Sequence, residues 1–276
     1  MRFPHGKTVF LTGGSSGIGR AAAELFAENG YTVFAASRSP QESGRDFPGG
    51  GAIRPIVMDV RAPESVDAAA EYVLAQCSPG IIIHCAGLGI ACAGEDYPAC
   101  DVTNLMNTNY NGVLLVNNRF LPNMRGRRNG LCIITGSVAG LFPIPFQSHY
   151  CASKAALDIY SSTLRMELRE YGVNVCLLMP GDTNTGFTSA RKYVIKETSP
   201  YYYDCLRAVQ KMEKDELRGQ RPAKAAHAML RLSEQRNPPA HRIVGLDYKF
   251  LVFLRRLLPE RATESILRSM YMRRQG

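Results

Sequence analysis

Short apolar runs alternate with longer amphipathic stretches along most of the chain. Runs rich in β-branched residues predict strands at residues 8–11, 31–37, 55–60, 81–85, 131–135, 173–179 and 242–244. Apolar residues at helical spacing predict helices at residues 17–29, 63–76, 103–121, 149–171 and 223–235. Because this alternation places helices between parallel strands, we predict an α/β fold with a doubly wound, parallel sheet of seven strands.

The organisation along the chain indicates one domain with an appended tail. The 276 residues, 45% hydrophobic and 21% charged, fit a globular protein and exclude a disordered chain. No linker or repeat divides residues 1–247, which we predict to form one domain, followed by a basic helical extension at 248–276. The last 28 residues hold seven basic and two acidic residues, so they carry +5 of the net charge of +9.

The cysteines and the short apolar runs indicate in which cellular compartment the protein is expected. No two of the eight cysteines have Cys-x-x-Cys spacing, and several lie in predicted strands, so we expect reduced core thiols, no metal site and a cytoplasmic protein. The apolar stretch near the N-terminus is too short for a signal peptide, and no later run approaches the roughly 20 residues that span a bilayer.

A glycine-rich turn joins the first predicted strand to the first predicted helix. Such a turn lets the backbone approach a pyrophosphate, and the helix N-terminus provides unpaired N–H groups and a partial positive charge. The turn lacks the Gly-Lys-Ser/Thr ending of a P-loop, so we predict a dinucleotide site rather than nucleotide hydrolysis. The contacting residues are predicted to be Gly13, Ser15, Ser16, Gly17, Ile18 and Gly19.

The end of the second strand indicates which dinucleotide binds. An NAD site needs a carboxylate about 20 residues beyond the glycines, where it accepts hydrogen bonds from the ribose hydroxyls. This chain has no acid between Asn29 and Gln41 and offers Arg38 instead. A guanidinium suits a 2′-phosphate, so we predict NADP(H) as the cofactor.

Candidate acid–base chemistry lies in the middle of the chain. Ser137 follows a predicted strand, and Tyr150 and Lys154 share one face of the next predicted helix because they are four residues apart. A free phenol has a pKa of about 10, and an adjacent cation favours the phenolate. Tyr150 can therefore donate a proton during carbonyl reduction and accept one during alcohol oxidation.

Taken together, these motifs resemble the short-chain dehydrogenases/reductases. The matching positions are Thr12-Gly13-x-x-x-Gly17-x-Gly19, Asp59-Val60, Ala86-Gly87, Asn109, Ser137, Tyr150-x-x-x-Lys154 and Pro180-Gly181, and they span residues 5–246. The resemblance implies a Rossmann fold and hydride transfer between NADP(H) and a carbonyl or secondary alcohol. It also implies a homodimer or homotetramer.

The resemblance further implies residue roles. Tyr150 is expected to donate the proton, Lys154 to lower the pKa of Tyr150 and hold the nicotinamide ribose, and Ser137 to steady the substrate oxygen. Asn109 is expected to hold a relay water, although Asn107 and Asn111 compete with it for that role. Further cofactor contacts are expected from Asp59, Val60, Ala86, Gly87, Pro180, Gly181, Thr183 and Thr185.

Two departures from the family pattern stand near these motifs. His84-Cys85-Ala86-Gly87 replaces the usual Asn-Asn-Ala-Gly and removes amide hydrogen bonds beside the cofactor. Asp182 follows Pro180-Gly181, and we favour a turn-capping role over a substrate contact for it. His149 adjoins Tyr150, and we expect it to be packed or solvated.

The expected pocket segments suggest the substrate class. Residues 88–90, 141–146 and 185–203 are apolar and aromatic, so we predict a small lipophilic substrate, steroid-like or retinoid-like. Short stretches of the sequence are also similar to the hydroxysteroid and retinol dehydrogenase branch. The alternative is a catalytically silent NADP(H)-sensing protein of the same fold.

The basic extension has two interpretations. A helix pair that closes the substrate site or joins a subunit interface is favoured over peripheral membrane contact through residues 249–276, although a basic amphipathic segment can lie on an anionic membrane. The chain has no aromatic-basic motif for nucleic acid, so we expect none to bind.

Overall fold

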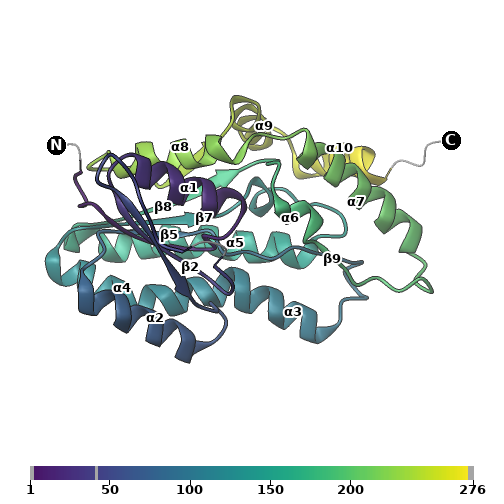
Figure 1. Cartoon of the computed structure of the whole chain (residues 1–276). Helices are drawn as coiled ribbons and strands as arrows, with labels where there is room; N and C mark the ends of the chain where they lie inside the picture. Colours follow the sequence, from purple (N-terminus) through teal and green to yellow (C-terminus); the bar gives the residue numbers. More distant parts are fainter. Residues whose placement is uncertain (1–2, 41–42, 273–276) are drawn as a thin grey trace.

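A sheet of eight strands forms the centre of the molecule (Figure 1). The structure is a computed structural model that describes residues 3–40 and 43–272. Seven strands run parallel in the order β10-β8-β7-β5-β1-β2-β4, and β3 is added antiparallel at the edge. The strands are β1 (Thr8–Thr12), β2 (Thr32–Ser37), β3 (Arg45–Asp46), β4 (Ala52–Val57), β5 (Ile81–His84), β7 (Gly130–Thr135), β8 (Val173–Pro180) and β10 (His241–Val244).

Helices cover both faces of this sheet, which confirms the predicted doubly wound Rossmann fold. On one face lie α1 (Gly17–Glu28) and α8 (Pro222–Ser233), and on the other lie α2 (Pro63–Gln76), α4 (Gly112–Arg127) and α5 (Ser148–Leu168). Alternate residues of a strand therefore enter different cores. In β1, Val9 and Leu11 pack under α1, whereas Phe10 packs against Phe120 of α4 with the ring centroids 4.3 Å apart.

The prediction of seven strands was wrong, because the sheet has an eighth strand, β3, at its edge. Its two residues pair with β4, Arg45 opposite Ile53 and Asp46 opposite Ala52. Both side chains of β3 are polar and exposed, so the hydrophobic pattern gives no signal for this strand. The chain reverses direction between β3 and β4, where the Phe47 N–H donates to the Gly51 carbonyl at 2.9 Å. A second, two-stranded sheet pairs β6 (Ile90–Ala91) with β9 (Lys192–Tyr193).

The helical regions also differ from the predictions in two places. The helix predicted at 103–121 is a longer unit made of α3 (Ala99–Met106), a π-helical turn (Asn107–Asn111) and α4. The helix α7 (Tyr202–Leu217) was not predicted, although Cys205, Ala208, Val209 and Met212 on its buried face have helical spacing. A four-residue helix, α6 (Gly186–Ser189), lies between β8 and β9.

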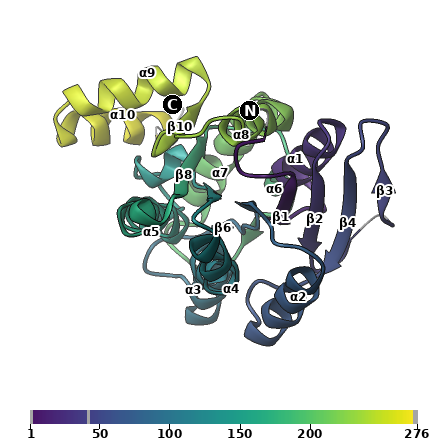
Figure 2. The same cartoon turned by 90° about the vertical axis from the view of Figure 1, so that its left-hand side faces the viewer.

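Two helices form the C-terminal extension, α9 (Leu246–Leu257) and α10 (Glu260–Met272). Figure 2 shows both helices on the outer side of the molecule, and α9 lies next to β10 while α10 lies next to α7. Arg273 and Arg274, which count toward the basic extension, lie outside the described residues. Within the described ranges, no helix is long and apolar enough to cross a membrane. All eight cysteines are free thiols.

His84 ends β5 inside a buried polar network. Its Nε2 lies 2.9 Å from Asn117 Oδ1, and the Asn117 amide donates to the Tyr160 hydroxyl at 3.1 Å. Burial lowers the pKa of His84 to about 4, although the hydrogen bond to Asn117 opposes the shift. The imidazole is therefore neutral at neutral pH and acts as a structural link between β5 and α4.

This network predicts an acid-sensitive fold. Between pH 6.5 and about 4 the unfolded chain binds a proton at His84 that the folded chain does not, so the free energy of unfolding falls as the pH falls. The loss from this group amounts to about 3 kcal/mol over that window. When the free energy of unfolding is measured by denaturant titration at several pH values, His84→Asn should make it depend less on pH. The control His227→Asn, on the exposed face of α8, should keep the pH dependence of the unaltered protein. If His84→Asn also keeps that pH dependence, buried His84 is not its cause.

Candidate active site

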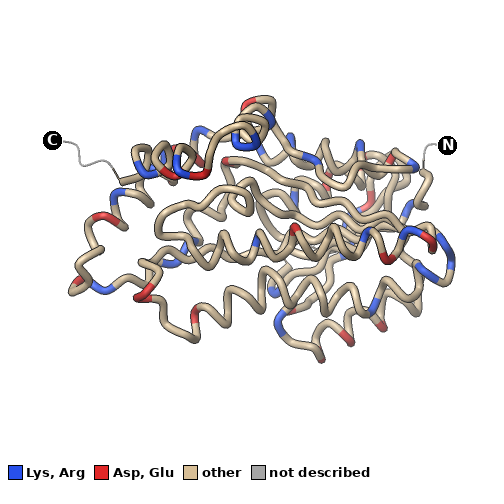
Figure 3. The backbone as a smooth tube through the Cα atoms, turned by 180° about the vertical axis from the view of Figure 1, so that it is seen from behind, with Lys and Arg blue, Asp and Glu red and all other residues tan. Residues whose placement is uncertain are grey.

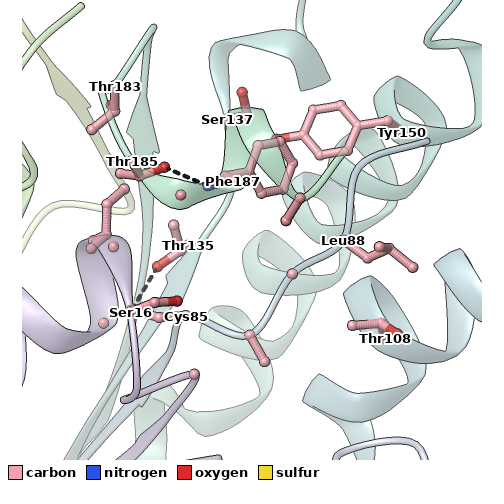
Figure 4. A pocket seen from close by; sticks show the side chains of 18 of the residues that line it. Ser16, Cys85, Leu88, Thr108, Thr135, Ser137, Tyr150, Thr183, Thr185 and Phe187 are labelled. Carbon is pink, nitrogen blue, oxygen red and sulfur yellow. Dashed lines mark hydrogen bonds between the residues drawn. The ribbon is translucent and has the colours of Figure 1, made fainter. Parts of the chain in front are cut away.

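A cleft of about 960 Å³ runs along the carboxyl ends of the parallel strands (Figure 4). It lies where the strand order reverses between β1 and β5, the place at which open α/β sheets bind ligands. With one exception, Asn109, the predicted site residues all line this cleft: Gly13, Ser15, Ser16, Gly17, Ile18, Gly19, Arg38, Asp59, Val60, Ala86, Gly87, Ser137, Tyr150, Lys154, Pro180, Gly181, Thr183 and Thr185.

The N-terminus of α1 opens into the cleft through the glycine turn. Gly13 has φ +74°, and a Cβ there would lie 2.6 Å from the backbone nitrogen of Ala86. A Cβ on Gly19 would lie 2.1 Å from the Gly13 carbonyl oxygen, so only glycine fits either position. Among the described residues no side chain caps this helix, and its first turn contains no acid. Its unpaired N–H groups therefore fit a pyrophosphate.

Positive charge gathers at the adenosine end expected for the cofactor. Arg38 follows β2 and is exposed at the cleft. Arg61 holds the Asp59 carboxylate in a two-point contact, with Nε 3.0 Å from Oδ1 and Nη2 2.6 Å from Oδ2. That hydrogen bonding, assisted by the charges of Arg61 and Arg38, keeps the pKa of Asp59 below its usual value despite partial burial. Two guanidinium groups thus face one carboxylate.

Arg61 was missed by sequence reasoning. It lines the cleft two residues after Asp59 and also donates from Nη1 to Asn104 Oδ1 at 2.7 Å. The spacing Asp-x-Arg after a strand is the only signal in the sequence, and it does not show that the two side chains fold back on each other.

Ser137, Tyr150 and Lys154 converge at the other end of the cleft. Ser137 follows β7, and its Oγ accepts a hydrogen bond of 3.1 Å from the backbone of Ala139. Tyr150 and Lys154 lie in the first turns of α5, with Lys154 Nζ 5.8 Å from the centroid of the phenol ring. Lys154 also donates to the Thr135 carbonyl at 2.9 Å. Figure 4 shows Ser137, Tyr150 and Phe187 gathered around one end of the pocket.

Burial controls the proton chemistry of this group. It raises the pKa of the Tyr150 phenol well above its usual value, and the hydrogen bond with Ser137 opposes this shift. Burial also lowers the pKa of Lys154 to about 8. The i, i+4 spacing predicts that Lys154 lowers the pKa of Tyr150. In this structure the largest cause of the shift is the desolvation of the phenol, which raises that pKa.

Asn109 lies outside the lining of the cleft. It is fully buried in the π-helical turn, where its Oδ1 accepts from Leu88 N at 2.7 Å and its Nδ2 donates to Leu88 O at 3.0 Å. The same amide donates to Ser153 Oγ at 3.1 Å, one residue before Lys154. The two competing asparagines, Asn107 and Asn111, bond to each other in a more exposed position. Asn109 is thus the one that braces the loop after β5.

Asp182 serves as an anchor for the C-terminal extension. Its carboxylate Oδ2 accepts from the Tyr248 hydroxyl at 2.7 Å, and its backbone N–H donates to the same hydroxyl at 2.9 Å. Burial raises the pKa of this carboxyl. His149 packs edge-on against the ring of Tyr97 with centroids 4.4 Å apart, as expected for a packed histidine.

The substrate end of the cleft has several apolar side chains, with Lys192 and Glu216 in the lining as well. Its lining includes Leu88, Ile144, Phe187, Met212 and Tyr271. Tyr271 comes from α10, so the C-terminal extension contributes a side chain to the lining of the pocket. Sequence reasoning missed both Met212 and Tyr271, since nothing local indicates that α7 and α10 fold back over the strand ends.

A buried ion pair lies directly behind this end. Arg191 is almost completely buried and donates to Glu216, whose carboxylate lines the cleft and also accepts from Thr188 Oγ1 at 2.7 Å. Within the described part of the chain, the Nε and Nη1 atoms of Arg191 have no hydrogen-bond partner. Glu216 is therefore the sole carboxylate that neutralises this buried cation among the described ion pairs.

This pairing predicts a large loss of stability on removing one partner. Glu216→Gln leaves the Arg191 cation buried and uncompensated, so the free energy of unfolding should fall by about 3–5 kcal/mol in denaturant titrations. The matched control is Asp215→Asn, which breaks the more exposed pair with Lys211 and should cost less than about 1 kcal/mol. Equal losses in both variants contradict the role given to Glu216.

Comparisons with known proteins agree with this geometry. A family model described as short chain dehydrogenase matches residues 7–193. The chain is 34% identical over 267 residues to a 3-ketodihydrosphingosine reductase of Bacteroides thetaiotaomicron, covering 95% of this chain and 97% of that protein. It is 33% identical over 189 residues to the 17-beta-hydroxysteroid dehydrogenase type 1 of Homo sapiens, covering 65% of this chain and 57% of that protein.

The fold has close counterparts among solved structures. A short chain dehydrogenase/reductase from Burkholderia phymatum in complex with NAD superposes with a TM-score of 0.78 at 25% identity, covering 93% of this chain and 95% of that one. Complexes with NADP occur among similar structures as well, so the fold alone leaves the choice of dinucleotide open. The chain therefore belongs to the short-chain dehydrogenase/reductase family of oxidoreductases, which act on carbonyl and alcohol groups.

Proposed function

We propose that this protein is an NADP(H)-dependent oxidoreductase that interconverts a lipophilic carbonyl compound and its secondary alcohol. The observation that carries the proposal is the single cleft that joins two sets of groups. At one end are the uncapped N-terminus of α1 and the guanidinium of Arg38, and at the other are Ser137, Tyr150 and Lys154. One extended dinucleotide bound along the strand ends would meet both sets.

The dinucleotide would be held by the residues that line its half of the cleft. The N–H groups of α1 face the expected position of the pyrophosphate, and Val60, Ala86 and Gly87 form the walls between the two ends. Thr183 and Thr185 lie beyond β8, where Thr185 Oγ1 accepts from Phe187 N at 3.2 Å. When bound, the cofactor supplies or accepts the hydride.

Three side chains of the protein would manage the proton. The raised pKa of Tyr150 keeps the phenol protonated at neutral pH, ready to donate to the developing alkoxide. The Ser137 hydroxyl can hold the substrate oxygen next to that phenol. Lys154, with a pKa of about 8, is mostly cationic at neutral pH, so its ammonium would stabilise the phenolate left by proton donation.

Asn109 would act as a positioning residue through Leu88 and Ser153, and its relay water stays a prediction. Residues 1–247 would hold the cofactor and the acid–base groups, with 248–276 closing the substrate end through Tyr271. The homo-oligomer and the cytoplasmic location also stay predictions.

A lipophilic substrate is supported by the lining and by the relatives. The apolar and aromatic side chains of Leu88, Ile144, Phe187 and Tyr271 favour an apolar molecule with few fixed charges. Two relatives are named for the reduction or oxidation of 3-ketodihydrosphingosine and of a 17-beta-hydroxysteroid, which fits the same class.

The acid–base assignment is tested by Tyr150→Phe. Removing the phenol oxygen should lower the turnover of a lipophilic ketone by about 10²–10⁴-fold or more, because the proton donor is lost. The NADPH dissociation constant, measured by fluorescence titration, should stay within about twofold because the cradle at α1 is untouched. Tyr72→Phe, at an exposed tyrosine of α2, is the matched control and should be fully active.

Two outcomes would contradict this assignment. Turnover retained in Tyr150→Phe excludes the phenol as the proton donor. NADPH binding by the unaltered protein without oxidation across steroids, retinoids and simple ketones favours the catalytically silent sensor instead.

The cofactor assignment is tested by Arg38→Asp. The carboxylate repels a 2′-phosphate and accepts hydrogen bonds from a ribose diol, so the KM for NADPH should rise about tenfold or more and the KM for NADH should fall. Steady-state kinetics with both cofactors measure the preference. Arg45→Asp, which makes the same charge change outside the cleft, should leave the preference unaltered. An unaltered preference in Arg38→Asp removes Arg38 from the site.

A further inference from the structure

The outward face of α9 carries an unpartnered apolar stripe. Leu246, Phe250, Phe253 and Leu257 are 80%, 60%, 57% and 65% exposed, and their spacing of four, three and four residues places them along one side of the helix. The opposite side packs on the protein, since Val252 is buried and Tyr248 bonds to Asp182. This helix therefore has an apolar face on each side, and only one of them is covered.

The helix that follows also carries exposed apolar side chains. On α10, Ile266, Met270 and Met272 are 48%, 49% and 38% exposed, whereas Tyr271 points inward and lines the cleft. The two helices form the outermost layer of this side of the molecule (Figure 2). Several large exposed apolar side chains on two outer helices favour an interaction surface over scattered surface residues.

Basic side chains border the stripe. Lys249, Arg255 and Arg256 on α9 are all exposed, against the single acid Asp247, and helical geometry places Lys249 and Arg256 beside the apolar row. Figure 3 shows basic positions along both C-terminal helices, with those of α10 balanced by acids. The excess positive charge of the described extension thus lies on α9.

We propose that the α9–α10 layer docks in the plane of an anionic lipid bilayer. A row of large apolar side chains flanked by lysine and arginine fits the interface between acyl chains and anionic headgroups. With 12 residues, α9 is long enough to lie in that interface and too short to span the hydrocarbon. A second copy of the chain fits less well, because a two-fold contact through the stripe would bring Lys249 and Arg256 of both copies together.

This placement would bring the substrate end of the cleft to the membrane. Tyr271 belongs to the same layer and lines the cleft, and Tyr248 fixes α9 to the loop after β8. A lipophilic substrate could then pass from the bilayer to Tyr150 without crossing water. This second step rests on the proposed function, whereas the docking itself does not.

Vesicle sedimentation of the full chain tests the docking. The protein should pellet with vesicles of equal parts phosphatidylcholine and phosphatidylglycerol, much less with phosphatidylcholine alone, and less as salt is raised. Phe250→Ser combined with Phe253→Ser should lower the partition coefficient about tenfold or more, because two apolar side chains no longer enter the interface. The matched control, Tyr72→Ser, removes an equally exposed aromatic residue from α2 and should pellet like the unaltered protein.

The charge contribution is tested separately. Lys249→Glu combined with Arg256→Glu should weaken sedimentation about tenfold or more at low salt. Arg45→Glu combined with Arg125→Glu makes the same charge change on β3 and α4, which lie away from the C-terminal helices (Figure 2), and should have little effect. Reduction of a water-soluble ketone should be unaltered in all these variants, which shows that they are folded.

The sedimentation results decide whether a bilayer or a second copy of the chain covers the apolar stripe of α9. Equal sedimentation with both vesicle types, or sedimentation that the serine variant does not change, overturns the proposal. Absence of vesicle binding together with a smaller mass of the serine variant in light scattering assigns the stripe to a contact between copies and also overturns it. If vesicles bind but Tyr150→Phe keeps full turnover, the docking stands and the proposed function fails.

For the delivery step, the apparent KM for a ketone dissolved in anionic vesicles should rise about tenfold in the serine variant while kcat for the water-soluble ketone stays constant. An unchanged KM in vesicles overturns delivery from the bilayer.

Discussion

The close approach of the glycine turn to the strand ends is the constraint on which the site depends. Because Gly13 and Gly19 carry no side chain, α1 starts directly above the ends of β1 and β5, where the strand order reverses. Thr12 Oγ1 fixes the same point by accepting from Cys85 N and Ala86 N, each at 3.3 Å. A bulkier turn would move α1 away from the sheet and separate its N-terminus from the rest of the cleft.

The sequence predicted those parts of the site whose signal is local. The glycine turn and the pair Tyr150 and Lys154 each lie within eight residues, so spacing along one helix or turn fixes their geometry. Glu216 and Tyr271 could not be predicted, because they reach the cleft from helices that pack only through tertiary contacts. The burial that raises the pKa of Tyr150 could not be predicted either, since the desolvation of its phenol depends on the tertiary packing around it.

The departure at His84 and Cys85 shows how an altered motif is accommodated. Asn117 of α4 takes the hydrogen bond of His84, and Cys85 Sγ lies 3.5 Å from Thr135 Oγ1. Burial raises the pKa of Cys85 to about 11 and lowers that of His84, so both side chains are uncharged at neutral pH. Neither residue therefore adds a charge that competes with the ammonium of Lys154, in keeping with the proton chemistry proposed for Tyr150 and Lys154.

The C-terminal extension is part of the site as well as its outer surface. The ring of Tyr248 occupies the space above Gly181, where a Cβ would lie 2.2 Å from it, and its hydroxyl holds both the backbone and the carboxylate of Asp182. The loop after β8 is thereby fixed from outside, and Thr183 and Thr185 in that loop are held at the cleft. The two sides of α9 thus differ: the inward side fixes the loop after β8, and Lys249 and Arg256 lie beside the apolar row of the outward side. Since the contacts of Tyr248 with Asp182 use neither Lys249 nor Arg256, substitutions that change the charge of the outward side need not disturb the cleft.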